Sequence, residues 1–395
     1  MSVQRKTSVA VVFGGRSVEH DVSIVTGHQI MRAFDADLFT AIPIYIDREG
    51  RWFTGDSLRE LKNFKNEITS LAGVTPIVLS PSVQHHGFII NPTASGLFNR
   101  SQVQRIDVMF PAVHGSHGED GTLQGLFELA DIPYVGCGVM ASAVANDKLM
   151  TKHVLRTQGV PVVDSVGFTR TEWLANPERV IAQIEKMLTY PLFVKPATLG
   201  SSIGISRADT TALLRAYIDV AAGFDERLLA ESAVTRSVEI NCSVLGDPNG
   251  YQSSVLEQPI SWQEFLTYEE KYLSGGEGMK SAERIIPAPL SPALTARIQE
   301  IAIQAFRVIN GRGIARLDFL VRPDTDEVFL NEINTMPGSL SFYLWQATGI
   351  SQTALVSKLV ALARDAYAEK RRNTYNYQTS LIALTAERGI KGLKK

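Results

Sequence analysis

The first 135 residues alternate between short apolar runs and helical patterns, and this alternation constrains the fold of the chain more than any other feature. Apolar runs predict buried strands at residues 8–13, 41–46 and 108–113, and amphipathic segments predict helices at 22–34 and 122–130. Strands that alternate with helices usually form a parallel sheet that helices cover. The pattern therefore predicts an N-terminal α/β domain with a parallel sheet.

Two smaller α+β units are predicted after this domain. A new helix begins near residue 141, and short apolar strands follow at 191–195 and 228–231. From Val238 the chain becomes rich in strand patterns again, with an amphipathic helix at 292–308. The predicted boundaries are 1–140 for the N-terminal domain, 141–236 for the central domain, 237–365 for the C-terminal domain and 366–395 for a C-terminal tail.

A long polar segment at residues 261–284 interrupts the C-terminal domain. Long loops inside compact domains are usually functional lids or disordered segments. Lys271 and Tyr272 lie in this segment and could close over a phosphate group. The alternative is an ordinary surface loop.

Composition excludes several classes of protein. The formal net charge of the 395 residues is -2, so bulk charge favours neither nucleic acid nor an anionic membrane. The two cysteines, Cys137 and Cys242, lie far apart without metal-like spacing, which fits a reducing compartment. We expect no signal segment at the N-terminus. The sequence contains no run of about 20 apolar residues, so we predict no membrane span. We expect a cytoplasmic enzyme or binding protein.

A predicted strand pair near residues 316–320 and 329–334 carries the strongest candidate site. Alternation along the second strand places Glu332 and Asn334 on one face, and Asp318 on the partner strand could face the same way. Two carboxylates and a carboxamide are the hard oxygen donors that Mg²⁺ prefers, usually with substrate phosphates. Arg316 would stand beside them and hold developing negative charge. The alternative is an exposed hairpin with surface charges.

A second candidate site follows the strand at 191–195. Lys195 ends this strand, and a glycine-serine loop with Ser201 and Ser202 runs to Gly204. Backbone N–H groups and hydroxyls of such a loop can surround phosphate oxygens. The lysine precedes the glycines, so the loop is not a Walker A motif. The alternative is a flexible hairpin tip.

Two loops at strand ends of the N-terminal domain carry polar residues. Glu19 could fix an amine or a hydroxyl, or could simply belong to an acidic first turn of the next helix. The loop from His114 to Gly121 holds two histidines and two acids, but its glycines favour a contact with substrate or another domain over a transition-metal site. Glu119 and Asp120 are expected at the start of the following helix.

In order and spacing, these motifs resemble the D-alanine–D-alanine ligases of the ATP-grasp superfamily, from about residue 9 to about residue 362. The resemblance implies a three-domain ATP-grasp fold in which ATP lies between the central and C-terminal domains. It also implies joining of two D-alanines through a D-alanyl phosphate for peptidoglycan precursors, two Mg²⁺ ions (or Mn²⁺), amino-acid substrates and a homodimer. The motifs that carry it are residues 14–19, 114–125, 147–148, 195–204, 268–272, 286–290, 316–318 and 331–338.

The resemblance also implies roles for individual residues. Asp318, Glu332 and Asn334 match magnesium ligands, while Arg316 and the Gly338 backbone match groups that stabilise an oxyanion. Glu19, Ser201 and Tyr272 match a hydrogen-bonded triad, and Glu19 and His114 fall at the first substrate. The positions that match nucleotide-binding residues are Lys148, Lys195, Ser202, Glu231, Glu239, Phe265, Lys271 and Asn331.

One segment departs from the family pattern. A serine and a leucine usually hold the carboxylate of the second substrate, but here the serine position is Tyr343, followed by the retained Leu344. A phenol can still donate one hydrogen bond to a carboxylate. The departure leaves open an acceptor such as D-serine, D-lactate or another amino acid. A non-catalytic nucleotide-binding protein on the same scaffold is the alternative of a different class.

Overall fold

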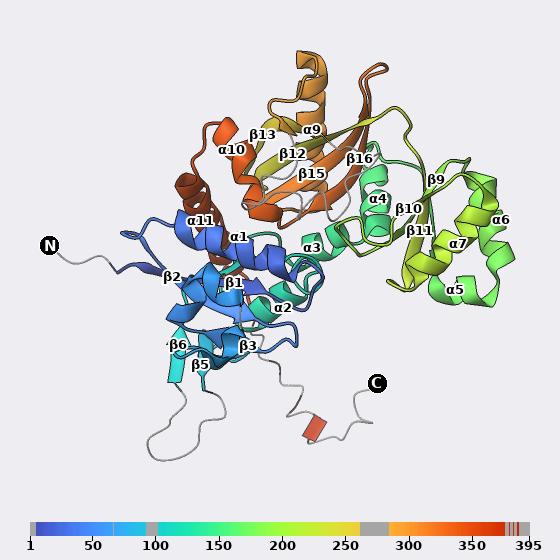
Figure 1. The fold of residues 1–395 in the computed structure, drawn as a ribbon. Coiled ribbons are helices and arrows are strands. Elements are labelled where there is room, and N and C mark those ends of the chain that lie inside the picture. The colour runs from blue at the N-terminus through green and yellow to red at the C-terminus, as the bar shows by residue number, and fades with distance from the viewer. Residues whose placement is uncertain are drawn as a thin grey trace.

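The computed structural model describes residues 5–65, 67–91, 102–260 and 284–375, and also residues 379, 382, 385 and 386. Three sheets follow one another along the chain, with seven, four and five strands (Figure 1). The central sheet and its helices lie at one end of the molecule, away from the N-terminal sheet. Within the described part of the chain, no helix is both long enough and apolar enough to cross a membrane.

The N-terminal sheet contains the predicted parallel strands and four that were not predicted. Its parallel part is β2 (Phe39–Ile46), β1 (Thr7–Gly14) and β7 (Val108–Pro111), with helices α1 (His20–Ala33) and α2 (Thr122–Leu129). Antiparallel strands extend it beyond β2: these are β3 (Trp52–Thr54), β4 (Thr75–Leu79), β5 (Gly87–Ile90) and β6 (Gln102–Arg105). These strands have three to five residues each, too short for a clear alternation in the sequence. Short 3₁₀ helices η1 (Asp56–Arg59), η2 (Leu61–Lys65) and η3 (Ile68–Ser70) lie between β3 and β4.

The central unit is an antiparallel sheet in the order β10-β9-β11-β8. Residues of α6 and α7 pack against the sheet in a core that includes Ile184, Ile218 and Val194. The elements are α3 (Val139–Asn146), α4 (Lys148–Thr157), β8 (Ser165–Thr169), α5 (Arg170–Ala175), α6 (Pro177–Met187), β9 (Leu192–Pro196), β10 (Ser206–Ala208), α7 (Thr211–Ala222) and β11 (Arg227–Ser232).

The C-terminal sheet is antiparallel, in the order β14-β13-β12-β15-β16. Helix α9 covers one of its faces, where Ile298 and Phe306 join the same core as Cys242 of β12. Asn241, Asp318 and Glu332 lie opposite one another on the other face. The elements are β12 (Val238–Asp247), β13 (Gly250–Pro259), β14 (Arg284–Ile285), α9 (Pro292–Val308), β15 (Gly313–Arg322), β16 (Glu327–Asn334), η4 (Gly338–Ser341), α10 (Phe342–Ala347) and α11 (Gln352–Lys370).

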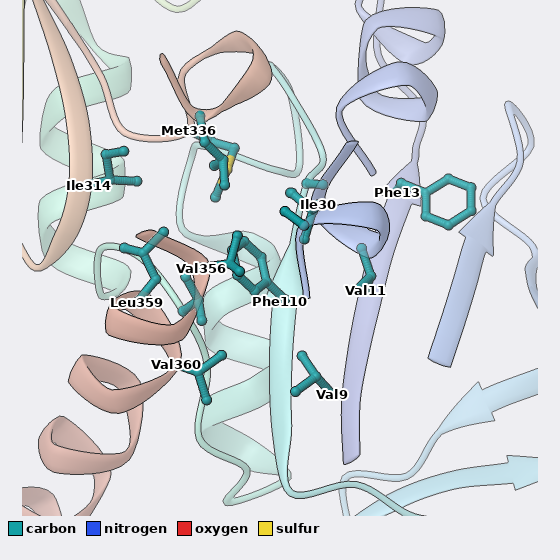
Figure 2. Close-up of a cluster of buried hydrophobic side chains, with 14 of the residues drawn as sticks. Val9, Val11, Phe13, Ile30, Phe110, Ile314, Met336, Val356, Leu359 and Val360 are labelled. Atoms are coloured by element: carbon teal, nitrogen blue, oxygen red, sulfur yellow. The ribbon is translucent and has the colours of Figure 1, made fainter. Parts of the chain in front are cut away.

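Helix α11 joins the last part of the chain to the first. Its residues Val356, Leu359 and Val360 share a buried core with Val9 of β1 and Phe110 of β7 (Figure 2). The helix continues to Lys370, so the predicted end of the C-terminal domain at residue 365 falls inside a helix. The other predicted boundaries, at 140 and 236, fall within α3 and just before β12 and stay predictions.

Candidate functional site

The register of β15 and β16 brings the predicted metal residues together. Arg316 lies opposite Asn334, and Asp318 lies opposite Glu332, so all four side chains belong to the same face. The register then shifts, because Phe319 pairs with Leu330. A β-bulge such as this is common next to functional sites, since it redirects a side chain. The predicted arrangement of the strand pair is confirmed.

Hydrogen bonds hold this group in place. Arg316 donates from Nε to Asp318 Oδ1 at 2.6 Å and from Nη2 to Oδ2 at 2.7 Å. Asn334 Nδ2 donates to Asp318 Oδ2 at 2.9 Å. Burial by itself lowers the pKa of Arg316, but the charge of Asp318 dominates and raises this pKa well above its usual value. The guanidinium therefore stays charged beside the carboxylate.

The donor set of this group suits a hard divalent cation. Asp318, Glu332 and Asn334 offer carboxylate and carboxamide oxygens, which are the ligands of Mg²⁺ in proteins. Among the described residues, no three His, Cys, Asp or Glu side chains form a cluster that could complete a metal site alone. Oxygen atoms from a bound phosphate would have to complete the coordination, as is usual for Mg²⁺.

Glu231 is a buried carboxylate that lies between two lysines. Glu231 of β11 pairs with Lys195 of β9, and its Oε2 lies 3.1 Å from Lys152 Nζ. Burial alone would raise the pKa of Glu231, but the ammonium groups of Lys152 and Lys195 lower it to about 2. Lys195 Nζ also donates to Asn331 Oδ1 at 3.3 Å. The predicted residues Lys195, Glu231 and Asn331 are thus neighbours.

The predicted glycine-serine loop lies next to a third lysine. Asp147 caps α4 by accepting from the N–H of Met150 at 2.9 Å, and Lys148 begins the helix. Lys148 Nζ donates to the carbonyl of Leu199 at 2.6 Å. Burial lowers the pKa of Lys148, which lies close to the loop. The structure therefore brings Lys148 and the loop together as the sequence suggested.

Two adjoining clefts meet at this loop. The first is lined by Lys195, Glu231 and Glu239, with Ser202, Asn331 and Glu332. The second is lined by Glu19, Glu119 and Lys148, with Glu332 and Asn334. Leu199, Gly200 and Glu332 line both clefts. Glu332 therefore lies where a ligand in one cleft would meet a ligand in the other.

The second cleft joins the N-terminal domain to the loop. Ser201 Oγ donates to Glu19 Oε1, and Ser201 has a left-handed backbone with φ of 54°. Glu19 itself begins α1 without a side-chain cap. At Gly115 a Cβ atom would come within 2.7 Å of Glu19 Oε2, so only glycine fits beside this carboxylate. Two members of the predicted triad, Glu19 and Ser201, are therefore in contact.

The prediction that Glu119 starts a helix is wrong. Its Oε2 accepts from Gly115 N–H at 2.8 Å and its Oε1 accepts from Met336 N–H at 2.9 Å, so the half-buried carboxyl connects the loop at Gly115 with the segment after β16. Burial, reinforced by the charge of Glu19, raises the pKa of Glu119 to about 8. Asp120, in contrast, accepts from Thr122 N–H at the start of α2.

His114 lies at the same junction. Its Nδ1 is 2.8 Å from the carbonyl of Met336, and its Nε2 is 2.9 Å from Thr26 Oγ1. Burial lowers the pKa of His114, so the neutral ring is favoured. Both ring nitrogens contact protein groups, and the predicted substrate contact of His114 stays a prediction.

The segment after β16 has an unusual backbone. Ser339, Leu340 and Ser341 all have φ near 50°, and Ser339 N–H donates to Thr26 Oγ1 at 3.2 Å. The segment then enters α10, where Leu344 is buried. The phenol of Tyr343 donates to Glu257 Oε2 at 2.7 Å.

Three predicted residues, Phe265, Lys271 and Tyr272, lie outside the described residues. Sequence reasoning also missed two residues of the site, Lys152 and Glu257. Lys152 follows Lys148 by four residues on α4, so helical spacing placed both lysines on one face. Glu257 gave no comparable signal, since its partners come from distant segments of the chain.

Comparisons with known proteins identify the family to which the chain is similar. The family model described as D-ala D-ala ligase N-terminus matches residues 8–137, and the model described as D-ala D-ala ligase C-terminus matches residues 154–361. The D-alanine–D-alanine ligase of Natranaerobius thermophilus is 39% identical over 385 residues, which cover 95% of this chain and 100% of that protein.

Solved structures of ligases are also similar to this chain. The VanG D-Ala:D-Ser ligase from Enterococcus faecalis superposes with a TM-score of 0.78 at 31% identity, covering 91% of this chain and 100% of that chain. The D-alanine-D-alanine ligase from Coxiella burnetii has a TM-score of 0.74 at 31% identity, covering 93% and 98%.

Proposed function

We propose, since the chain belongs to the D-alanine–D-alanine ligase family, that it joins two D-alanines at the expense of ATP for peptidoglycan precursor synthesis. The observation that carries this proposal is the meeting of two clefts at Glu332, one lined by Lys195 and Glu231 and the other by Lys148 and Glu19. Such a site can hold a nucleotide and an amino acid with their reacting groups adjacent. A cytoplasmic location and a homodimer remain predictions.

Family membership implies ATP and a divalent metal ion. We assign the metal, as two Mg²⁺ ions, to Asp318, Glu332 and Asn334, whose oxygen donors suit this cation. When bound, the ions would neutralise phosphate charge and orient the terminal phosphate. The triphosphate would lie beside Lys148, Lys195 and the glycine-serine loop, with Ser202, Glu231, Glu239 and Asn331 along the nucleotide cleft.

The first step depends on positioning. Glu19 would bind the amine of the first D-alanine, and Ser201, which donates to Glu19, would orient it. The carboxylate of this D-alanine then attacks the γ-phosphorus, the bond to the β-phosphate oxygen breaks, and D-alanyl phosphate and ADP result. Phosphoryl transfer needs alignment and charge neutralisation more than covalent help, and the buried lysines supply both.

The second step forms the peptide bond. The amine of the second D-alanine attacks the acyl carbon, loses a proton, and phosphate leaves. Negative charge develops on the acyl oxygen of the tetrahedral intermediate. The charged Arg316 and the backbone N–H of Gly338 would stabilise that oxygen.

An acceptor other than D-alanine is not favoured, although Tyr343 departs from the usual pattern. The Natranaerobius thermophilus relative carries the name D-alanine–D-alanine ligase at 39% identity, whereas the D-Ala:D-Ser ligase is 31% identical. Likewise the non-catalytic alternative is not favoured, because the predicted metal and lysine positions that the structure describes are all occupied by suitable side chains.

The test is a product assay with the purified protein, ATP and Mg²⁺. We expect release of ADP in proportion to a D-alanyl-D-alanine product identified by mass spectrometry. In separate reactions with D-alanine plus D-serine or D-lactate, we expect less D-alanyl-D-serine or D-alanyl-D-lactate than D-alanyl-D-alanine. ADP release without any dipeptide from D-alanine alone would contradict the proposal.

A further inference from the structure

The polar row of the metal site continues across the C-terminal sheet. Glu332, Asp318, Asn241 and Glu257 lie opposite one another on the adjacent strands β16, β15, β12 and β13. Directly opposed residues share a face, so Glu257 faces the same side as the metal residues. Arg284 of β14 lies opposite Pro259, two residues from Glu257, and therefore belongs to this face too. The row thus ends in a carboxylate and a guanidinium.

Tyr343 covers this end of the row. Its hydroxyl donates to Glu257 Oε2 at 2.7 Å, and Arg284 Nη1 lies 3.1 Å from Glu257 Oε1. The Arg284 guanidinium also lies over the Tyr343 ring, with 4.3 Å between Cζ and the ring centroid. The three side chains form one connected cluster, in which each contacts the other two.

This geometry changes what Tyr343 can offer to a ligand. The single O–H of the phenol is directed at Glu257, which is almost fully buried. Burial and the charge of Glu257 raise the pKa of Tyr343, so the phenol remains protonated. A carboxylate has no proton to donate, so it gains nothing from a phenol whose hydrogen is already bound.

Among the described residues, the guanidinium of Arg284 contacts Glu257 and the Tyr343 ring, which leaves N–H donors available. A guanidinium carries five N–H groups in a planar fork, and only the edge at Nη1 faces Glu257. The ring of Tyr343 fixes the plane of the fork, and 29% of the Arg284 side chain is exposed. In contrast, Arg316 already uses Nε and Nη2 on Asp318. Arg284 can therefore receive a carboxylate without losing its contact with Glu257.

The position of Arg284 suits the second substrate. The strands β13 and β15 are two steps apart in the sheet, which corresponds to roughly 10 Å between Glu257 and Asp318. The long side chains of Arg284 and Arg316 shorten this gap, and Arg316 is near enough to affect the pKa of the Tyr343 phenol. An amino acid between the two arginines would direct its amine toward the acyl carbon, whose oxygen Arg316 would stabilise, and its carboxylate toward Arg284.

We propose that Arg284 binds the carboxylate of the acceptor amino acid, while Glu257 and Tyr343 act as positioning residues that hold the guanidinium in place. This inference rests on the proposed ligase function. Tyr343 replaces the usual serine because its ring and hydroxyl orient Arg284, which supplies the charge-assisted hydrogen bonds that a serine would otherwise provide.

The experiment compares two acceptors that differ in the carboxylate. D-Alanine carries one, whereas hydroxylamine does not, yet both amines can attack D-alanyl phosphate and release phosphate. For Arg284→Met we expect kcat/KM for dipeptide formation to fall by about 10- to 100-fold, the range for losing hydrogen bonds to a charged group. Formation of D-alanine hydroxamate, measured in the same preparation, should stay within about twofold of the unmodified enzyme, because the step before it does not involve Arg284.

Three further variants separate binding from folding. Arg284→Met leaves Glu257 buried without its cation, so the double variant Arg284→Met with Glu257→Gln removes this charge and should show the same kinetic pattern. Arg284→Lys keeps the charge without the fork and should lose less. Arg322→Met is the matched control, since Arg322 lies on the same sheet with 27% of its side chain exposed and pairs with Glu327; both products should form normally.

The outcomes are distinct. Selective loss of dipeptide in both Arg284→Met variants supports the assignment. Equal loss of dipeptide and hydroxamate, or loss of neither, would overturn it. If the unmodified enzyme formed neither product from D-alanine and ATP, the proposed function would fail first, and the acceptor site with it.

Discussion

The strand pair β15–β16 and the segment from Gly338 to Leu344 are separated by three residues, yet they are built in different ways. In the strand pair, ladder pairing places Asp318 opposite Glu332, so the position of each side chain follows from register. In the segment, three successive residues with left-handed backbone are held by contacts with other parts of the chain, such as Thr26 of α1. The oxygen atoms that we assign to the metal thus lie on a sheet, while the neighbouring segment depends on tertiary packing.

This difference has a functional meaning. A sheet fixes the relative positions of the side chains that we assign to the metal, because register tolerates little variation. A segment held by tertiary contacts can change without disturbing the sheet. Tyr343, where we expect a departure from the family pattern, lies in the second region, next to Glu257 and Arg284.

The largest expected effect comes from the strand pair. Glu332→Gln should lower kcat by about 100-fold or more, because it removes a carboxylate that would contact metal and phosphate, on the scale of losing one stabilising group in a transition state. The thermal unfolding midpoint should hardly change, because the strand remains paired. Glu327→Gln on the same strand is the control and should retain activity. Normal turnover of Glu332→Gln would contradict the metal assignment.

A change at Thr26, which forms a hydrogen bond with the segment, should act on stability instead of turnover. Thr26→Val removes the hydroxyl that accepts from Ser339 N–H and contacts His114. We expect the free energy of unfolding to fall by about 1–3 kcal/mol, the cost of leaving buried polar groups unpaired. Urea denaturation measures this value, with Thr40→Val on an exposed position of β2 as the control. Equal stability of both variants would show that the segment does not depend on this contact.

The junction between the two regions should respond to pH. The pKa of Glu119 is raised to about 8 in the folded protein, above its ordinary value of 4.5, so its contribution to stability is full below pH 4.5 and is lost as pH rises to 8. Glu119→Gln should therefore flatten the decrease in unfolding free energy between pH 5 and pH 8. Denaturation of the ligand-free proteins across this range measures the slope. Parallel slopes for both proteins would be inconsistent with a buried, protonated carboxyl.

The smallest effect concerns the backbone of the segment. Ser341 has φ of 48°, and among the described residues its buried hydroxyl has no hydrogen-bond partner. Ser341→Gly relieves the left-handed strain but adds entropy to the unfolded chain, so we expect a gain of at most about 1 kcal/mol. Ser341→Ala, which keeps the Cβ atom, separates the effect of the hydroxyl from that of the backbone. A clear loss of stability in Ser341→Gly would mean that the left-handed backbone at Ser341 is not strained.

The same contrast explains what the sequence could predict. Alternation and spacing located Arg316, Asp318, Glu332 and Asn334 because strand geometry repeats every two residues. Helical spacing places Lys152 on the same face of α4 as Lys148, but it does not predict the pairing of Lys152 with Glu231. The position of Glu119 between Gly115 and Met336, and the cluster of Tyr343, Glu257 and Arg284, could not be predicted either, because each joins segments that are distant in the chain.

The most direct test of the account is a crystal structure with ADP and Mn²⁺, analysed by anomalous scattering. The account predicts metal peaks in contact with Asp318, Glu332 and Asn334, with the β-phosphate toward Lys148 and Lys195. Metal peaks elsewhere, with Asp318 still bound only to Arg316 and Asn334, would contradict it.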